Sequence, residues 1–332
     1  MKQLTYIFIC IILFFSSCDW HNNIPSEEVR IHRFDRIVDE YASLNSFSAL
    51  QRMNTEYPQA TRLLIEDVLE IGKVQDPRIE QKLREFYLDS TMQVLLEAVH
   101  DEYNNLNKEE KELNDVFLQL HEIDPNFKIP QIYTQISGLN QSIIVGNGIV
   151  GISLDKYLGA DYPLYKKYYY DHQRHLFRRN RIVPDVLFYY LSSVYSLPED
   201  QSHTLLDYML DYGKLSWVIA KLRKVNQIEQ VGIDQEQVEY YTTHEATVWN
   251  YLMSHQILKT KNLAIVKNYM MPQPKTKEFS VESPGQIGVW LGIRIIDTYM
   301  KSHKDISIKD LLYDNNYQSI LNASGFHPTP SK

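Results

Sequence analysis

Residues 283–300 (SPGQIGVWLGIRIIDTYM) constrain the fold most, because after a Pro-Gly break they predict a helix that is apolar on nearly every side. A helix without a polar face has to be surrounded by protein. Gly288 and Gly292 are four residues apart, which leaves a shallow groove where another backbone can approach closely. Arg294 stands inside the apolar run, and its expected ion-pair partner is Asp297, three residues later, or another nearby carboxylate. The sequence therefore predicts a core helix with a close helical neighbour.

The first 18 residues predict an export signal. Lys2 supplies a positive charge, residues 7–15 form an apolar core, and small residues precede Cys18. The core is too short to span a bilayer comfortably, and the small residues indicate cleavage. A cysteine in this place is typical of a bacterial lipoprotein signal, so we expect residues 1–17 to be removed and Cys18 to be lipidated. An ordinary secretory signal with an incidental cysteine is the alternative.

Both cysteines, Cys10 and Cys18, lie in this segment, so the mature body is expected to have no disulfide and no cysteine metal ligand. About 310 mature residues are enough to bury a large core without disulfides. No later run of eighteen apolar residues occurs, so the lipid is the expected membrane attachment. A formal net charge of −8 with interspersed signs argues against nucleic acid and anionic lipid as partners.

Most of the body has helical periodicity. Residues 18–25 are typical of a polar tether, and we expect a single domain over 26–332 that is helical from 43 to about 113 and again after 184. Between 131 and 154 the period changes, and Asn-Gly between two β-branched runs is a strong hairpin signal. The sequence therefore predicts a mainly α protein (α+β) with a small antiparallel β-meander around 131–154.

Tyrosine is unusually dense between 157 and 195. Its members are Tyr157, Tyr162, Tyr165, Tyr168, Tyr169, Tyr170, Tyr189, Tyr190 and Tyr195. Tyrosine stacks on sugars, but it also packs helices with its hydroxyl group reaching a polar partner. Because these residues do not alternate onto one exposed face, packing is the preferred interpretation. The charged run at 107–112 (NKEEKE) predicts a solvated helix face.

Two groups of histidines suggest metal sites, and neither fits. The sequence Thr-His-Glu-Ala-Thr-Val around His244 is similar to a zinc-protease helix, which needs a second histidine four residues later. Val248 occupies that place, and His255 lies about 16 Å away by helical rise. His172 and His175 could chelate a metal on a helix, but the surrounding arginines disfavour a divalent cation. No activated serine pattern and no phosphate loop occurs, so the residues alone predict no catalytic or cofactor site.

Several modest motifs carry a resemblance through their order and spacing. They are IHRFD at 31–35, YTQISGLN at 133–140, ISLDKYLG at 152–159, GK at 213–214, Glu245 with WNY at 249–251, SPGQIGVWLG at 283–292 and ILNASGFHP at 320–328. In these motifs the chain resembles the gliding-motility lipoprotein GldB and its non-gliding relatives in Bacteroidota. The resemblance singles out candidate structural or signature residues, which are Asp35, Asn140, Asp155, Gly213, Lys214, Glu245, Trp249, Gly288, Gly292 and Arg294.

That family is in turn distantly similar to predicted zinc-dependent peptidases of the zincin type. In those proteins a strand meander precedes a helix with two histidines, and the next helix supplies a third ligand just before a glycine. The correspondence would place the histidine helix at 184–195, which contains no histidine, and the third ligand at about Tyr212 before Gly213. The resemblance thus implies a zincin-like helical domain without the ligands that zinc needs. It also implies that the helices around Tyr189 and Gly213 are the neighbours of the core helix at 283–300.

The expected function is a non-catalytic interaction or assembly factor of the cell envelope, linked by the resemblance to gliding motility and secretion machinery. We expect no enzyme activity, no cofactor, no metal and no nucleic acid. The expected partners are the membrane, through the lipid on Cys18, and other envelope proteins, in the outer membrane rather than the inner. Two alternatives stay open: a degenerate metallopeptidase-like hydrolase that uses His244, Glu245 or the His172–His175 pair, and a glycan-binding lipoprotein that uses tyrosines 168–170.

Overall fold

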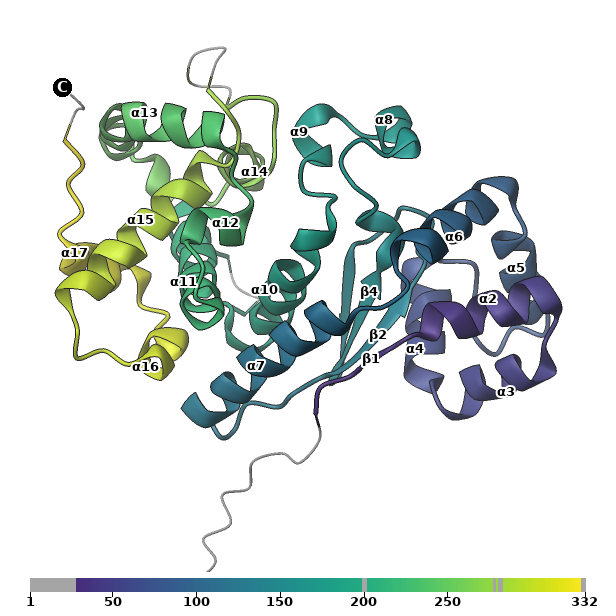
Figure 1. Ribbon diagram of the computed structural model, residues 1–332. Coiled ribbons are helices and arrows are strands. Elements are labelled where there is room, and N and C mark those ends of the chain that lie inside the picture. Colours follow the sequence, from purple (N-terminus) through teal and green to yellow (C-terminus); the bar gives the residue numbers. More distant parts are fainter. Residues whose placement is uncertain (1–27, 199–201, 277–278, 280–282, 330–332) are drawn as a thin grey trace, which may run out of the picture.

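A computed structural model describes residues 28–198, 202–276, 279 and 283–329 of the chain (Figure 1). The predicted signal peptide at 1–17, the lipidation site Cys18 and the tether at 18–25 lie outside these described residues. The described part is mainly helical with one small sheet, which confirms the predicted fold class. None of its helices is both long enough and apolar enough to cross a membrane.

The sheet has four strands in the order β1-β2-β4-β3. Its strands are β1 (Ile31–His32), β2 (Gln131–Gln135), β3 (Ile143–Gly146) and β4 (Ile149–Ser153). The hairpin of β3 and β4 is antiparallel, as the Asn-Gly signal predicted, and Gly148 in its turn has φ +74°. The predicted antiparallel meander is otherwise wrong, because β2 pairs in parallel with β4 and β1 pairs in parallel with β2.

The path of the chain after β2 explains the mixed sheet. Gly138 and Leu139 both have φ +67°, so the backbone turns sharply at this point. The side chain of Asp155, just after β4, accepts hydrogen bonds from the backbone amides of Ser137 and Leu139. These bonds hold the connection at the end of β4, and β3 then pairs with the far edge of β4. A residue 18 positions away sets the topology, so the local pattern could not reveal it.

Most helices of the N-terminal half lie on one side of the sheet, and α10 (Ile182–Tyr195) packs against β3 and β4 on the other side, where α7 packs against it (Figure 1). The N-terminal elements are α2 (Phe34–Leu44), α3 (Phe47–Thr55), α4 (Pro58–Arg62), a π-helix (Leu63–Val68), α5 (Ile79–Tyr87), α6 (Ser90–Glu102) and α7 (Asn107–Ile123). The solvated face predicted for 107–112 is wrong at Glu109, which is 5% exposed. Its carboxylate binds Arg179 at 2.8 Å and thereby ties α7 to the chain before α10.

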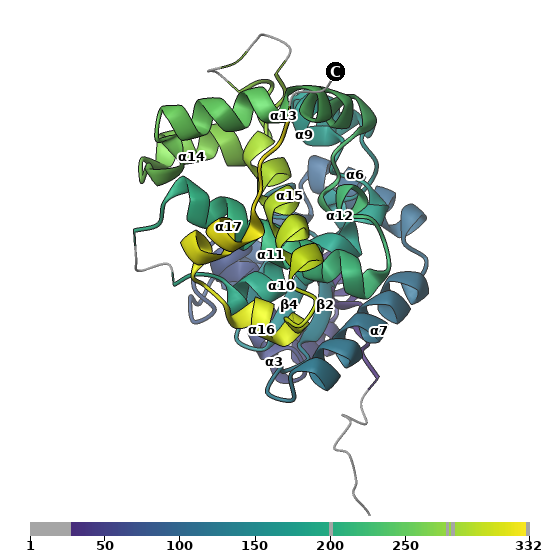
Figure 2. The same ribbon diagram turned by 90° about the vertical axis from the view of Figure 1, so that its left-hand side faces the viewer.

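The second half of the chain is helical, as predicted. Its elements are 3-10 turns at Leu154–Lys156, Arg179–Arg181 and Ile257–Lys259, and helices α8 (Pro163–Tyr168), α9 (Asp171–Arg174), α10 (Ile182–Tyr195), α11 (Leu205–Arg223), α12 (Gln227–Val231), α13 (Gln235–Ser254), α14 (Leu263–Met270), α15 (Ile287–Ser302), α16 (Ile308–Tyr313) and α17 (Tyr317–Ser324). Helix α15 is enclosed by α11, α13, α14 and α17, which confirms the predicted core helix (Figure 2). It begins at Ile287, two residues after the Pro-Gly break, and Gln286 before it has φ +63°.

The two helices α11 and α15 cross at a pair of glycines. A Cβ atom added to Gly213 would lie 2.5 Å from the backbone carbon of Gly292, and one added to Gly292 would overlap the carbonyl group of Met209. Real interiors are close-packed and do not allow such contacts, so only glycine fits at either position. The groove predicted at Gly292 is confirmed, and α11 is the neighbour that occupies it. The other predicted neighbour, α10, packs against α11 and the sheet.

Candidate functional site

The candidate signature residues of the N-terminal half brace the sheet. Asp35 pairs with Arg33 through two bonds of 2.9 and 2.7 Å and also accepts a hydrogen bond from the hydroxyl group of Thr134 on β2. The side-chain amide of Asn140 donates to the carbonyl oxygen of Val68 at 2.9 Å. Each contact joins the sheet or its connections to an N-terminal helix, which is a structural role.

Asp155 is fully buried and carries most of the hydrogen bonds at the end of β4. It accepts bonds from the amides of Ser137 at 2.9 Å and Leu139 at 2.7 Å, and from the hydroxyl group of Ser137 at 3.2 Å. Burial raises the pKa of Asp155, and the two amide groups oppose that shift. The carboxylate therefore accepts the hydrogen bonds that a neighbouring β-strand would otherwise accept from these loop amides.

Lys156 follows directly and is also buried. Its ammonium group lies 4.2 Å from the ring centres of both Tyr169 and Phe177, and it donates to the hydroxyl group of Tyr169 at 2.8 Å. Burial lowers the pKa of Lys156 to about 8, against the opposing effect of Asp155. We call Ser137, Leu139, Asp155, Lys156 and Tyr169 the Asp155 cluster.

Signature residues of the C-terminal half join helices to one another. The buried ammonium group of Lys214 lies 2.9 Å from the side-chain oxygen of Asn315 and 3.6 Å from Asp211. Trp249 packs edge-on against Phe326, with ring centres 5.2 Å apart. Burial lowers the pKa of Lys214, and Asp211 opposes the shift. These residues fix α11 and α13 against the end of the chain.

Arg294 pairs with Glu245 of α13 at 2.9 Å, and Glu245 also accepts a bond from the indole of Trp290 at 2.9 Å. The ion pair predicted with Asp297 does not form, because Asp297 pairs with Lys301 at 2.7 Å. The alternative, a nearby carboxylate, is the one that the structure shows. A Cβ atom added to Gly288 would lie 2.8 Å from the sulfur of Met270. The missing side chain at Gly288 therefore allows α14 to pack closely against α15.

The histidines that suggested metal sites have separate, local contacts. The Nδ1 atom of His244 lies 2.8 Å from the carbonyl oxygen of Tyr240, and His255 makes the same contact with Tyr251 at 3.0 Å. His172 stacks on the exposed ring of Tyr170. Across the described ranges, no three His, Cys, Asp or Glu side chains gather in a way that could hold a metal ion.

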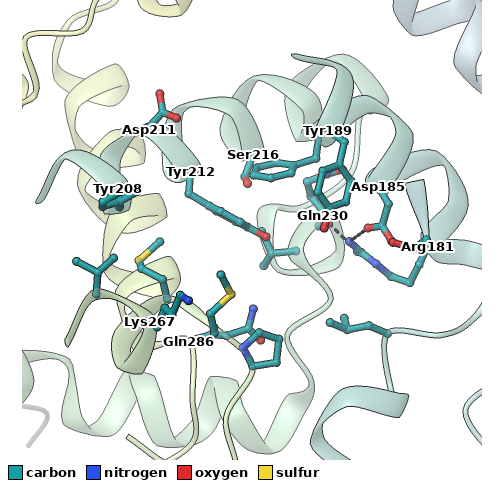
Figure 3. Close-up of a pocket in the computed structure, with 18 of the residues that line it drawn as sticks. Arg181, Asp185, Tyr189, Tyr208, Asp211, Tyr212, Ser216, Gln230, Lys267 and Gln286 are labelled. Carbon is teal, nitrogen blue, oxygen red and sulfur yellow. Dashed lines mark hydrogen bonds and ion pairs between the residues drawn. The ribbon is translucent and has the colours of Figure 1, made fainter. Parts of the chain in front are cut away.

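A cavity of about 540 Å³ lies between α10, α11 and α14 (Figure 3). Its wall is largely apolar and includes Leu176, Phe188, Val231, Val266 and Met270. Its size falls within the roughly 300–1,000 Å³ of typical small-molecule sites. None of the candidate signature residues lines it.

One end of the cavity is polar, and its centre is Arg181, which is 8% exposed. The guanidinium group donates to the Asp185 carboxylate at 2.6 Å and to the carbonyl oxygen of Gln230 at 2.7 Å. The second oxygen of Asp185 accepts a bond from the hydroxyl group of Tyr157 at 3.0 Å. Burial opposes the charge on Arg181, but the nearby Asp185 outweighs it and raises the pKa of Arg181. We call this end of the cavity the Arg181 end.

Two polar groups in the cavity wall have no partner among the described residues. The Nε atom of Arg181 and the hydroxyl oxygen of Ser216 are buried and make no hydrogen bond within the described ranges. The side chains of Tyr189 and Tyr212 point toward the same space (Figure 3). Burial raises the pKa of Tyr212, and partial burial raises that of Tyr189, which is 47% exposed, so both hydroxyl groups keep their protons at neutral pH. Buried polar groups normally have partners, so a group of unpaired donors beside a cavity marks a binding site.

The sequence predicted no binding site here, although the resemblance pointed to two of the helices that line the cavity. The helix expected in the place of a histidine helix is α10, and it lines the cavity through Asp185 and Tyr189, while Tyr212 faces them from α11. Sequence reasoning missed Arg181 and Ser216. The available signal was Arg181 four residues before Asp185 at the start of a strongly apolar helix, because a charge in such a place needs a partner.

Comparison with known proteins adds one family. A family model described as gliding motility protein GldB matches residues 17–328. No curated protein and no solved structure matches the chain.

Proposed function

Because the chain belongs to the family of the gliding motility protein GldB, we propose that it is a lipid-anchored factor of the cell envelope that binds other molecules without catalysing a reaction. In this proposal Cys18 holds the chain at the outer membrane, and the folded body serves motility-related or secretion-related assemblies. The observation that carries the non-catalytic part is the pairing of Arg181 with Asp185 in the cavity.

Hydrolysis needs a base or a metal that can activate water. Two carboxylates line the cavity, Asp185 and Asp211. Asp185 already accepts bonds from Arg181 and Tyr157, and Asp211 accepts a bond from the hydroxyl group of Tyr317. Both carboxylates are thus committed to structural partners. This arrangement favours a cavity that binds over one that catalyses.

A peptidase-like ancestry fits this proposal. Asp185 and Tyr189 are four residues apart on α10, and Tyr212 follows on α11, as a three-ligand metal site would require by spacing. Phenol groups and a carboxylate already bound by Arg181 are a poor ligand set for zinc, which prefers histidine, cysteine and free carboxylates. We infer that such a cleft has been kept for binding.

Crosslinking in native membranes tests the envelope role. The natural lipidated protein should crosslink to a reproducible set of envelope proteins, whereas Cys18→Ser should lose both membrane attachment and most of these crosslinks. If Cys18→Ser remained at the membrane with the same partners, the anchor proposal would be wrong.

Metal content and peptide cleavage test the non-catalytic role. We expect the purified mature protein to carry no stoichiometric zinc and to leave a mixed peptide library intact. Zinc at one ion per chain together with cleavage would overturn the proposal. Loss of that cleavage in His244→Ala, with unchanged cleavage in the matched variant His255→Ala, would locate the activity on α13.

Glycan binding is the second candidate, because Tyr168 and Tyr170 are 54% and 74% exposed. Tyr169 between them is committed to Lys156. A glycan array with the natural chain and with a Tyr168→Ala, Tyr170→Ala double variant separates the two functions. Binding that disappears in the double variant supports this candidate, and no binding to any polysaccharide eliminates it.

A further inference from the structure

We propose that the cavity binds an acyl chain, with the acyl carbonyl group held at the Arg181 end. This inference rests on the binding role proposed above for the same cavity and names the chemical class of its ligand.

The apolar part of the cavity suits a flexible hydrocarbon chain. Val231 and Val266 give it a wall of branched side chains, and Met270 and Met271 add thioethers. Methionine side chains adapt their shape to an apolar ligand more readily than branched ones do. Burying such a chain removes apolar surface from water, which supplies most of the binding energy.

The Arg181 end requires a ligand that accepts hydrogen bonds. Arg181 Nε can only donate, and Ser216 Oγ, which lines the same cavity, has no hydrogen-bond partner among the described residues. The hydroxyl groups of Tyr189 and Tyr212 add further donors in the same space (Figure 3). A carbonyl oxygen placed there would satisfy these donors together.

The charge at this end favours a neutral carbonyl over a second carboxylate. Arg181 and Asp185 form an ion pair of 2.6 Å, so their charges cancel. An added anion would meet the Asp185 carboxylate, and like charges at close range disfavour ionisation. An acyl ester or a protonated fatty acid meets this condition.

An apolar peptide fits less well. A peptide backbone carries a donor and an acceptor at every residue, and each of these needs a partner when buried. Two buried groups of the cavity wall, Arg181 Nε and Ser216 Oγ, are unpaired, and most of the remaining wall is apolar, with Asp211 and Lys267 as its further charged residues. One polar head followed by a bare chain matches this distribution.

Displacement of a fluorescent polyene fatty acid tests the proposal. The mature chain would carry Cys18→Ser, so that its own lipid cannot fill the cavity. Unlabelled palmitic acid and methyl palmitate are the competitors, and a leucine-rich hexapeptide is the comparison ligand. We expect both acyl competitors to displace the probe and the peptide to fail. Displacement by palmitic acid alone would indicate a free fatty acid, and displacement by both would extend the site to acyl esters.

Variants connect the binding to the cavity. Tyr212→Phe removes one donor and should weaken acyl binding about tenfold, as expected for one buried hydrogen bond. The matched variant Tyr168→Phe, on an exposed ring outside the cavity, should bind as the parent does. Ser216→Leu would fill the cavity and abolish binding, with a melting temperature to show that the variant is folded.

Two results would overturn the proposal: no displacement by either acyl competitor, or equal affinity in Tyr212→Phe and the parent. Tighter displacement by the hexapeptide would reassign the cavity to peptides. None of these results bears on membrane attachment or zinc content, so a failure of the acyl site is distinguishable from a failure of the envelope role.

Discussion

The Asp155 cluster and the Arg181 end of the cavity use similar residues for different purposes. Each places a carboxylate close to a basic side chain, and this carboxylate is fully buried in the Asp155 cluster and partly buried at the Arg181 end. In the Asp155 cluster the carboxylate accepts three hydrogen bonds of 2.7–3.2 Å from Ser137 and Leu139. At the Arg181 end two buried donors remain unpaired. Because an unpaired buried polar group is destabilising, the first region contributes stability and the second gives up stability to keep a site for a ligand.

The two regions are in contact. Phe177 covers the ammonium group of Lys156 and also lines the cavity. Tyr157 follows Lys156 in the chain, and its hydroxyl group donates to Asp185. The Asp155 cluster therefore positions two side chains that line the cavity. Substitutions in each region can measure how far stability and ligand binding are separate properties of the two regions.

Removing the carboxylate of Asp155 or of Asp185 gives the largest expected difference in stability between the two regions. Asp155→Ala leaves the amides of Ser137 and Leu139 without their acceptor and removes the nearby negative charge that favours the buried Lys156 ammonium group, so we expect it to lower the free energy of unfolding by about 4 kcal/mol. Asp185→Ala leaves Arg181 bound to the carbonyl groups of Gln230 and Glu229, and its loss should be about 2 kcal/mol. Urea unfolding measures both, and equal losses would contradict the contrast.

Of these two regions, only the Asp155 cluster should contribute to the pH dependence of stability between about pH 8 and 9.5. Burial lowers the pKa of Lys156 from 10.5 to about 8, so between these values the unfolded chain binds more protons than the folded chain. The free energy of unfolding should therefore rise with pH above 8, by about 2 kcal/mol up to pH 9.5. Arg181 stays protonated throughout and adds no slope.

Unfolding at pH 7.5, 8.5 and 9.5 tests this dependence. Lys156→Met should reduce the slope, to which Lys214 contributes with the same sign because burial also lowers its pKa, while Tyr168→Phe should leave the slope unchanged. Above pH 10 the trend reverses, because burial raises the pKa of Tyr87 and Tyr157 in the folded chain and the unfolded tyrosines ionise first. A parent curve that falls between pH 8 and 9.5 would contradict the prediction.

The sequence predicted the secondary-structure elements better than it predicted which elements and side chains contact one another. An apolar run with two glycines was enough to predict α15 as a core helix, because its periodicity and its glycines are local signals. The ion pair of Arg294 was assigned first to its own helix, yet its partner Glu245 is 49 residues away on α13. The same limit hid the parallel pairing of β2 with β4, which depends on Asp155 holding a distant loop.

The site shows that limit more strongly. The residues singled out by family resemblance, such as Asp155 and Lys214, brace the fold and do not line the cavity. Ser216 has no local signature, because a serine in a helix gives no sign of whether its hydroxyl group will find a partner. Only the packing of α10 and α14 against α11 shows that it does not.

Matched serine variants give a smaller contrast. Ser137 and Ser216 are both fully buried, but only Ser137 has a hydrogen-bond partner for its hydroxyl group. We expect Ser137→Ala to lower the free energy of unfolding by about 1.5 kcal/mol and Ser216→Ala to leave it unchanged or raise it by up to about 1 kcal/mol. Both are measured by urea unfolding without ligand. A loss in Ser216→Ala as large as that in Ser137→Ala would show that Ser216 has a structural partner.

Tyr212→Phe gives the smallest expected change in stability. Its hydroxyl group points into the cavity, and its ring packs against Phe188 with ring centres 4.4 Å apart (Figure 3). Because the substitution keeps the ring, the free energy of unfolding should change by less than about 0.5 kcal/mol, while acyl binding weakens about tenfold. Ser137→Ala should do the reverse, with lower stability and unchanged acyl affinity. If each variant changed both stability and acyl affinity, the Asp155 cluster and the Arg181 end would act as one unit. Tyr157 and Phe177, which contact both regions, would then couple them.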